Sequence, residues 1–273
     1  MRCAAIVGTG LIGGSFGLAL RKARFQGPII GVSSDRSIAE ALTRGAIDRG
    51  ASLADACAEA DLIFLSQPIS GILETLRKLD PLVRTGALVT DAGSTKRAIV
   101  EEAARSLRRC AFLGGHPMAG KESRGAAAAD ADLFRDRPWV LTSELDHPVA
   151  RVLRKWIGLF GAREVILDAG EHDALVAWSS HLPQLASTAL ASVLGEQAPD
   201  ASQVAGPGLV DMTRLAMSSY DLWSDILDTN REAVRFALNA YIEKLQALRG
   251  DYEKEFAQGS EFAIKLRARS FTK

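Results

Sequence analysis

The sequence predicts an α/β domain with a doubly wound parallel sheet, followed by an all-α domain. Three observations predict this order. In the first half, short apolar runs rich in Val, Ile and Leu alternate with helical stretches, which is the rhythm of a parallel sheet with helices on both faces. A glycine-rich segment directly follows the first of these runs. After about residue 168 only long helical stretches remain, so we divide the chain into residues 1–165 and 166–273.

The composition of the 273 residues is typical of a soluble globular protein, with 47% hydrophobic and 24% charged residues. The 33 basic and 33 acidic side chains give zero formal net charge, so we expect no nucleic-acid partner. There is no long uninterrupted apolar run and no signal-peptide pattern, so we expect no membrane partner. The three cysteines have neither metal-like nor disulfide-like spacing. We therefore expect a cytoplasmic protein without disulfides or a metal.

The elements of the first half follow one another in a regular order. The expected strands are CAAIV (3–7), IIGVS (29–33), LIFLS (62–66), ALVTD (87–91), AFLGG (111–115) and WVLT (139–142). The expected helices between them are 11–23, 37–45, 70–79 and 95–107. A helix over 149–160 and a short strand over 162–167 complete the domain. The strands are apolar runs rather than alternating ones, as expected where both faces of a sheet are covered.

The second half is expected to be helical over 171–194, 209–218, 220–249 and 251–267. Apolar residues recur at helical spacing between 230 and 250, at Val234, Leu238, Tyr241, Leu245 and Leu248. Long helices with an apolar stripe and no sheet to cover often pack against a second copy of themselves. We therefore expect a helical homodimer.

The segment AIVGTGLIGGSFGLAL (5–20) places Gly8, Gly10 and Gly13 in G-x-G-x-x-G spacing. It follows a strand and opens a helix, which is the context that gives this spacing its meaning. Gly8 permits a tight turn, Gly10 lets a pyrophosphate approach the backbone, and Gly13 lets helix and strand pack closely. Leu11 and Ile12, at the start of the helix, complete the predicted phosphate-binding segment. These features predict a Rossmann-type dinucleotide-binding domain.

The choice of nicotinamide cofactor depends on the end of the second strand, in GVSSDRS (31–37). NAD-binding domains place an acidic residue there, about 20 residues beyond the glycines. This chain has Ser33, Ser34 and Arg36 instead, which suit the 2′-phosphate of NADP. The neighbouring Asp35 keeps NAD possible, and Arg36 is alternatively a solvated loop residue.

Two more segments are expected at the carboxyl edge of the sheet, where ligands of such folds bind. Ser66, Gln67 and Pro68 end the third predicted strand and would lie beside the cofactor, or would only end the strand. Ser94, in DAGSTK (91–96), is an N-cap of the next helix or an active-site hydroxyl. Lys96 in the same segment faces an anion or solvent.

The chain has only four histidines, and His116 is the candidate base among them. It follows the last parallel strand, so it would also lie at the ligand edge, where a neutral imidazole can accept a proton. The alternative is a buried, hydrogen-bonded histidine. His147 lies in a polar turn and is expected at the surface. His172 lies at a helix start beside acidic residues.

Two polar clusters in the helical half are candidate parts of a pocket. In WSSHLPQ (178–184), Pro183 interrupts an apparent helix and leaves His181 and Gln184 as polar wall residues, unless the kink serves only packing. In the segment 206–226, Asp211, Arg214 and Ser218 share a predicted helical stripe. Arg214 would bind a carboxylate in a bidentate pair, or would form an ion pair with Asp211 alone.

Five segments carry a resemblance to a known family, in the order GTGLIGGS, DAGSTK, GGHPMAGKESRG, SHLPQ and GLVDMTRLAMSSYDLWSDI. Together they extend over essentially the whole chain, and they resemble the prephenate/arogenate (cyclohexadienyl) dehydrogenase family of tyrosine biosynthesis. The first motif is shared by many dehydrogenases, whereas the last three are specific. The resemblance implies a Rossmann domain followed by a helical dimerisation domain, with active sites between the domains.

The resemblance also implies the reaction and the roles of individual residues. The reaction would be NAD(P)-dependent oxidative decarboxylation of prephenate to 4-hydroxyphenylpyruvate, or of arogenate to tyrosine, with hydride leaving the ring carbon that bears the hydroxyl. His116 would take the hydroxyl proton, Ser94 would support His116 or the substrate, and Arg214 would bind a substrate carboxylate. His181 would line the substrate pocket, and Glu122 would be the acid at its mouth.

One position departs from the family pattern. Many members carry HLPH where this chain has HLPQ, so Gln184 replaces a second histidine. Its neutral amide would accommodate the keto group of prephenate or the amine of arogenate, which leaves the substrate preference open. Two other functions remain as alternatives. Another NADP-dependent hydroxyacid dehydrogenase or imine reductase would be expected to place a catalytic lysine or other group in the helical domain. A non-catalytic cofactor-sensing protein would not need His116.

Overall fold

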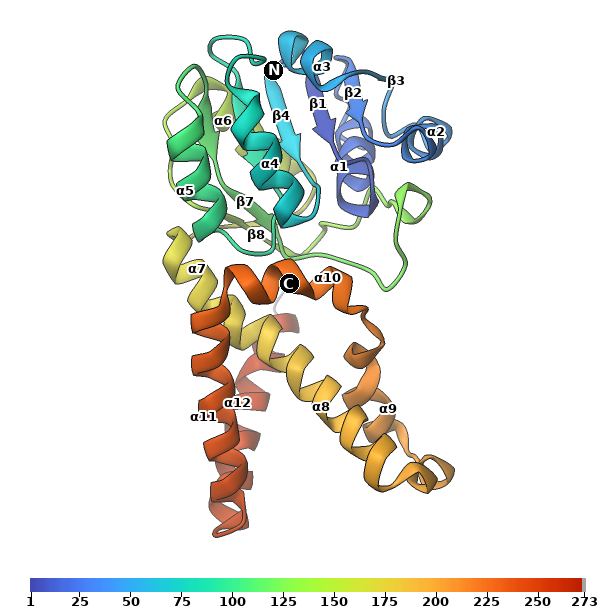
Figure 1. Cartoon of the computed structure of the whole chain (residues 1–273), viewed down its shortest axis with the longest axis vertical. Coiled ribbons are helices and arrows are strands. Elements are labelled where there is room, and N and C mark those ends of the chain that lie inside the picture. The colour runs from blue at the N-terminus through green and yellow to red at the C-terminus, as the bar shows by residue number, and fades with distance from the viewer. Residues whose placement is uncertain (272–273) are drawn as a thin grey trace.

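The first half of the chain is built on a six-stranded parallel sheet, seen in the upper part of Figure 1 in a computed structural model that describes residues 1–271. The strand order is β3-β2-β1-β4-β5-β6, and every neighbouring pair is parallel. The strands are β1 (Ala4–Val7), β2 (Ile29–Val32), β3 (Arg49–Gly50), β4 (Leu62–Leu65), β5 (Leu88–Asp91) and β6 (Ala111–Leu113). The order reverses between β1 and β4, and their carboxyl ends form the edge at which doubly wound folds bind ligands.

Helices cover both faces of this sheet, which confirms the predicted fold class. They are α1 (Leu11–Lys22), α2 (Asp35–Thr43), α3 (Leu53–Glu59), α4 (Ile69–Leu79), α5 (Arg97–Ser106) and α6 (Pro148–Leu159). Alternate strand residues supply two separate cores. Ile6 and Phe64 pack with α1, α2 and α6, whereas Val7 and Leu65 pack with α3, α4 and α5. In the first core the rings of Phe16 and Phe64 stack at 4.2 Å between centroids.

A second, three-stranded sheet corrects two of the predicted strands. It contains β7 (Gly115–Pro117), β8 (Pro138–Leu141) and β9 (Arg163–Ile166), with β7 and β8 antiparallel. The expectation of one strand over 111–115, and of 139–142 in the large parallel sheet, is therefore wrong. The chain turns at Gly114, where a Cβ would lie 2.8 Å from the Thr142 hydroxyl. This turn places His116 inside β7 rather than in a loop. The two-residue β3 has no apolar run that would have predicted it.

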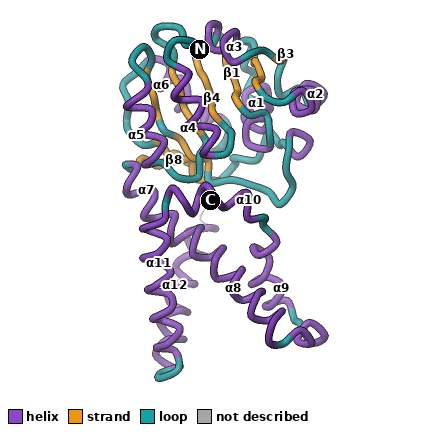
Figure 2. Tube along the Cα trace, in the orientation of Figure 1, coloured by secondary structure: helices purple, strands orange, loops and turns teal. Residues whose placement is uncertain are grey.

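From Ala169 to Phe271 the regular elements are all helices, joined by short loops, as the colouring of Figure 2 shows. They are α7 (Ala169–Val176), a π-helical turn (Ala177–His181), α8 (Leu182–Gln197), α9 (Pro207–Thr213), a 3-10 turn (Arg214–Met217), α10 (Tyr220–Thr229), α11 (Arg231–Leu248) and α12 (Tyr252–Phe271). The interruption predicted at Pro183 within the helix over 171–194 is confirmed, as a π-helical turn that directly precedes α8. The predicted helix over 220–249 is also interrupted, at Asn230, where no break was predicted. None of the helices within residues 1–271 combines the length and apolar character of a membrane span.

The helical half forms two arms that diverge from the α/β half in Figure 1, one of α8 and α9 and one of α11 and α12. Its own buried apolar core is small and consists of Ala177, Val234 and Ala237. The predicted stripe on α11 is buried at Val234 but 45% exposed at Leu245. Many large apolar side chains on these arms therefore stay exposed to solvent within the part of the chain that the structure describes.

Candidate active site

The glycine-rich turn between β1 and α1 has the geometry of a phosphate-binding loop. Gly8 has a φ of +94°, and a Cβ there would lie 2.8 Å from the carbonyl oxygen of Ser66. A Cβ on Gly13 would collide with the carbonyl oxygen of Gly8. Gly10, by contrast, has no atom within 4 Å of a Cβ position, and as N-cap of α1 it offers no side chain to the first N–H groups. The free space and free donors fit a pyrophosphate.

The remaining predicted residues of this loop support it from neighbouring positions. Leu11 and Ile12 are the first two residues of α1 and are half-buried. The hydroxyl of Ser66, at the end of β4, donates to the carbonyl of Gly8 at 2.7 Å and so holds the turn. Gln67 accepts a hydrogen bond from the Thr75 hydroxyl at 2.9 Å, so its side chain is directed to α4, which Pro68 caps.

Ser33, Ser34 and Arg36 lie at the carboxyl end of β2 and are exposed. Ser34 is the N-cap of α2 and accepts from the N–H of Ser37. The side chain of Arg36 is 91% exposed and forms a 3.0 Å ion pair with Glu40, one helical turn along. Exposed pairs of this kind contribute at most about 1 kcal/mol, so Arg36 is readily available to another anion.

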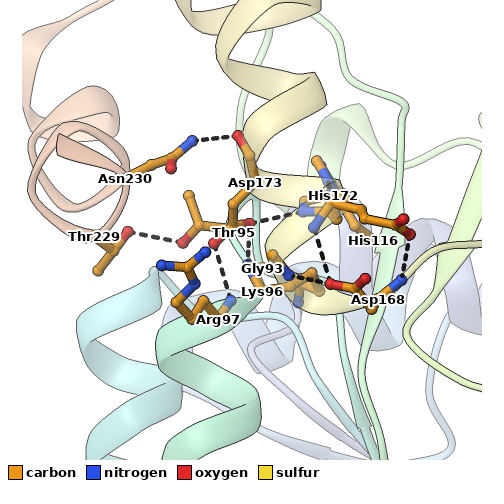
Figure 3. A network of polar contacts seen from close by, with 12 residues as sticks. Gly93, Thr95, Lys96, Arg97, His116, Asp168, His172, Asp173, Thr229 and Asn230 are labelled. Carbon is orange, nitrogen blue, oxygen red and sulfur yellow. Dashed lines mark hydrogen bonds and ion pairs between the residues drawn. The ribbon is translucent and has the colours of Figure 1, made fainter. Parts of the chain in front are cut away.

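His116 belongs to a chain of three side chains, drawn in Figure 3. Its Nδ1 lies 2.9 Å from Nε2 of His172, and Nδ1 of His172 lies 2.8 Å from a carboxylate oxygen of Asp173. His116 is half-buried, while His172 is fully buried and Asp173 nearly so. One nitrogen of His116 is thus engaged by the protein, which leaves its Nε2 as the nitrogen that a substrate can reach.

Asp173 also connects the two halves of the chain. Its carboxylate accepts the N–H groups of Lys96 at 2.6 Å and Arg97 at 3.0 Å, at the start of α5, which has no side-chain cap of its own. Its carbonyl accepts from the amide of Asn230 at 2.7 Å. Burial disfavours the charged carboxylate, but the hydrogen bonds from His172, Arg97 and Lys96 outweigh it and lower the pKa of Asp173 below its usual value.

A buried ion pair lies beside this chain of side chains. Lys96 and Asp91 are both fully buried and paired with each other. Asp91 also accepts the N–H of Gly93 at 2.8 Å and that of Gly115 at 3.0 Å. Burial lowers the pKa of Lys96, and Asp91 and Asp173 act in the opposite direction. Lys96 therefore faces an anion, and the alternative that it faces solvent is wrong.

The surroundings of His116 favour its neutral form. Burial is the main cause that holds its pKa well below the ordinary histidine value, and the positive charge that His172, Lys96 and His181 can carry lowers it further. A neutral imidazole is a proton acceptor at physiological pH. The geometry therefore supports proton transfer at this position.

Ser94 lies in the turn between β5 and α5 and is half-buried. The expectation that it caps the next helix is wrong, because α5 begins at Arg97 and its N-cap is Lys96. The helix start is capped instead by Asp173, from the other half of the chain. A catalytic role of Ser94 stays a prediction.

His181 ends the π-helical turn and Gln184 lies in the first turn of α8, and both side chains are buried. The ring of His181 packs edge-on against Trp223 at 5.9 Å, and its Nδ1 lies 3.3 Å from the amide nitrogen of Asn230. Burial lowers the pKa of His181 to about 4. The amide of Gln184 donates to the carbonyl of Leu215 at 2.8 Å. Gln184 thus holds the residue next to Arg214, and contact of either side chain with substrate stays a prediction.

Arg214 and Glu122 lie together, although 92 positions separate them in the sequence. The guanidinium and carboxylate approach to 3.5 Å, with the two side chains 54% and 67% exposed. The predicted helical stripe of Asp211, Arg214 and Ser218 is wrong, because α9 ends at Thr213 and a 3-10 turn follows. The turn directs Arg214 to the loop after β7 instead.

The sequence motifs did not reveal the roles of His172, Asp173 and Asn230. In the sequence, His172 is distinguished only by its acidic neighbours, and Asp173 and Asn230 belong to no recognisable motif. The signal available was a His-Asp pair in the first turns of a helix that directly follows the last strand. The hydrogen-bond partners of this pair elsewhere in the chain lie between 56 and 77 residues away, so only the fold brings them together.

Comparisons with known proteins agree with this arrangement. The family model described as prephenate dehydrogenase, nucleotide-binding domain, matches residues 16–165. The model described as prephenate dehydrogenase, dimerization domain, matches residues 168–260. The prephenate dehydrogenase of Lactococcus lactis is 38% identical over 240 residues, covering 85% of this chain and 66% of that protein. This chain thus spans slightly less than two thirds of that relative.

Solved structures match over nearly the full length. Prephenate dehydrogenase from Aquifex aeolicus, in complex with hydroxyphenyl propionate and NAD+, superimposes with a TM-score of 0.87 at 30% identity, covering 98% of both chains. Arogenate dehydrogenase from Synechocystis superimposes with a TM-score of 0.77 at 33% identity, covering 97% of this chain and 96% of that one. The resemblance drawn from the sequence motifs is confirmed. The chain belongs to the prephenate/arogenate dehydrogenase family.

Proposed function

We propose that this chain oxidatively decarboxylates prephenate, arogenate or both, to 4-hydroxyphenylpyruvate or tyrosine, with NADP as the preferred hydride acceptor. Membership of the family makes the chain an oxidoreductase of this class that uses a nicotinamide cofactor. One observation of the site carries the proposal. His116 is held at the ligand edge of the sheet with one nitrogen bonded to His172 and with a pKa that keeps it neutral.

His116 is the base in this reaction. It takes the proton of the ring hydroxyl while hydride leaves the same carbon, which becomes a ketone. A bound nicotinamide, held by the Gly8–Gly13 loop and the start of α1, would accept that hydride. Loss of the ring carboxylate as carbon dioxide then returns an electron pair to the ring. The oxygen regains its proton from His116, so the base is restored and the ring is aromatic.

Arg214 binds a carboxylate of the substrate, in the position where its guanidinium now faces Glu122. Both side chains are more than half exposed, so the existing pair is weak and an incoming carboxylate can replace it. The turn that carries Arg214 is held on α8 by Gln184 and by the hydroxyl of Ser187, which accepts the N–H of Ala216 at 3.1 Å. We assign substrate contact to His181 and Gln184, and support of His116 to Ser94, as part of the same proposal.

The Arg214→Ala variant is expected to raise KM for the substrate roughly 10- to 100-fold, with a smaller effect on kcat. The reason is the loss of a charged hydrogen-bonded pair worth about 1.5–3 kcal/mol. Initial rates at varied substrate concentration measure it. The control is Arg231→Ala, which removes an arginine with a similarly exposed ion pair, to Asp228, on α11. A KM equal to that of the wild type would remove Arg214 from this role.

NADP is favoured over NAD because Ser33, Ser34 and Arg36 stand at the end of β2 and Arg36 is largely solvent-exposed. A guanidinium that is itself 91% exposed, although paired with the half-buried Glu40, suits a 2′-phosphate. The ratio of kcat/KM for the two cofactors tests this part of the proposal, and a strong preference for NAD would refute it.

We also propose that the helical half, residues 166–273, joins two copies of the chain, and that residues 1–165 bind the cofactor in a cytoplasmic enzyme. Support for a homodimer comes from the name of the matching dimerization model and from the exposed apolar side chains of α9 to α12. Among these, Val210 is 61%, Met217 73% and Phe236 68% exposed. Burial of such side chains against a second copy is the usual way to remove them from water.

A further inference from the structure

We propose that His172 and Asp173 are positioning residues that fix the tautomer of His116, so that Nε2 is the unprotonated nitrogen presented to the substrate. This inference rests on the proposed role of His116 as the base. A neutral imidazole carries its proton on only one of two nitrogens, and it can act as a base only through the other. The identity of the protonated nitrogen is therefore part of the chemistry.

The direction of the hydrogen bonds follows from Asp173, which ends the hydrogen-bonded series His116, His172 and Asp173. An ionised carboxylate only accepts hydrogen bonds, so Nδ1 of His172, 2.8 Å away, carries the proton. Nε2 of the neutral His172 is then an acceptor. The atom 2.9 Å from it is Nδ1 of His116, which must donate and so carries the proton of that ring. Nε2 of His116 is left with a free electron pair.

Asp173 is well suited to set the direction of these hydrogen bonds because its own position is fixed. Its carboxylate accepts the N–H groups of Lys96 and Arg97, and its carbonyl accepts from Asn230. These contacts come from α5 in the first half and from the N-cap of α11 in the second half (Figure 3). The base is therefore prepared only where α7 is docked against α5. Domain docking and the tautomer of His116 depend on the same carboxylate.

The other ionisable groups around His116 do not offer it a competing hydrogen bond within the described residues. Lys96 is paired with Asp91, and His181 lies beside Asn230. Both groups, with His172, act on His116 through charge. Within residues 1–271, the one hydrogen bond that the structure shows to the imidazole of His116 runs to His172. If the acceptor on His172 is removed, no other side chain therefore holds the proton of His116 on Nδ1.

Two substitutions of His172 separate this role from a packing role. The side-chain oxygen of His172→Gln can take the place of Nε2 and still accept from His116. The shorter His172→Asn can take the place of Nδ1, which keeps contact with Asp173 but gives His116 no acceptor. We expect His172→Asn to lower kcat roughly 10- to 100-fold, with little change in KM, and His172→Gln to recover most of that loss.

The tautomer itself is read by NMR of protein labelled with 15N-histidine, at neutral pH. The chain has only four histidines, so single variants assign the signals. We expect Nδ1 of His116 to be protonated in the wild type and in His172→Gln, and its proton to move to Nε2, wholly or in part, in His172→Asn. His147→Asn, outside the network and still able to cap α6, is the control and should change neither kcat nor the His116 signals.

Protonation of His116 on Nε2 in the wild type would overturn the inference, as would equal kcat and equal His116 signals in the two His172 variants. These outcomes are distinct from failure of the proposed function. A wild-type chain that turns over neither prephenate nor arogenate would refute the function, whereas the NMR signals report the tautomer without any turnover. Circular dichroism of both variants shows whether the fold is retained, and the His116 signals of whichever variant folds decide the inference.

Discussion

The His116→Ala variant is expected to lose at least about 100-fold in kcat while it retains affinity for NADP, because it removes a positioned base and nothing from the glycine-rich loop. Initial rates with saturating substrate measure kcat, and titration calorimetry measures NADP binding. The matched control is His147→Ala, which removes a histidine that only caps α6. A near-normal kcat in His116→Ala would refute the mechanism, and loss of NADP binding together with kcat would point to a damaged fold instead.

The pH dependence of the same enzyme provides a separate prediction. Burial first, then the charges that His172, Lys96 and His181 can carry, hold the pKa of His116 well below its usual value of 6.5. The base is active when neutral, so kcat/KM falls only when the pH drops through this lowered pKa. We expect kcat/KM to show no loss attributable to His116 between pH about 7.5 and about 6. A midpoint of the acid limb at or above 6.5 would contradict the described surroundings of His116.

The Asp91→Ala variant is expected to lower the free energy of unfolding by about 3–5 kcal/mol. Asp91 and Lys96 both have fully buried side chains, so the substitution leaves the lysine without its partner. It also removes the acceptor of the Gly93 and Gly115 N–H groups. Urea unfolding followed by circular dichroism measures the change.

Two further variants test the cause of that loss. Glu74→Ala removes the partner of Lys78 from an ion pair whose side chains are 66% and 63% exposed, and it should leave the urea midpoint essentially unchanged, because solvent screens such a pair. The double variant Asp91→Leu with Lys96→Met leaves no buried charge and should be more stable than Asp91→Ala. If the free energy of unfolding of Asp91→Ala is within about 1 kcal/mol of that of the wild type, the buried pair is not needed for folding.

The parts of the fold that could be predicted from the sequence are those that local residue patterns determine. The glycine spacing and the apolar runs identify the strands β1, β2, β4 and β5 because adjacent residues determine them. The strands β8 and β9 could also be predicted, but their pairing with β7 in a separate sheet could not. The separation of that sheet depends on the close contact of Gly114 with Thr142 and on the bond from Gly115 to Asp91, between segments far apart in the sequence.

The candidate site shows the same division. His116, Arg214 and Glu122 stand in motifs, and the structure places Arg214 and Glu122 together. The functions of His172 and Asp173 could not be read in this way, because the hydrogen-bond partners of both lie far away in the sequence. Lys96 could equally have faced solvent on local evidence. The burial of Lys96 depends on the packing of α5 against α7, which local sequence does not reveal.

Formation of reduced nicotinamide by the purified chain is the most direct test of the account, with prephenate and arogenate each paired with NADP and with NAD. We expect turnover of at least one of the two substrates, with a higher kcat/KM for NADP than for NAD. Faster turnover with NAD would contradict the assignment of Ser33, Ser34 and Arg36 to a 2′-phosphate. The absence of turnover with all four pairs would contradict the proposed function itself.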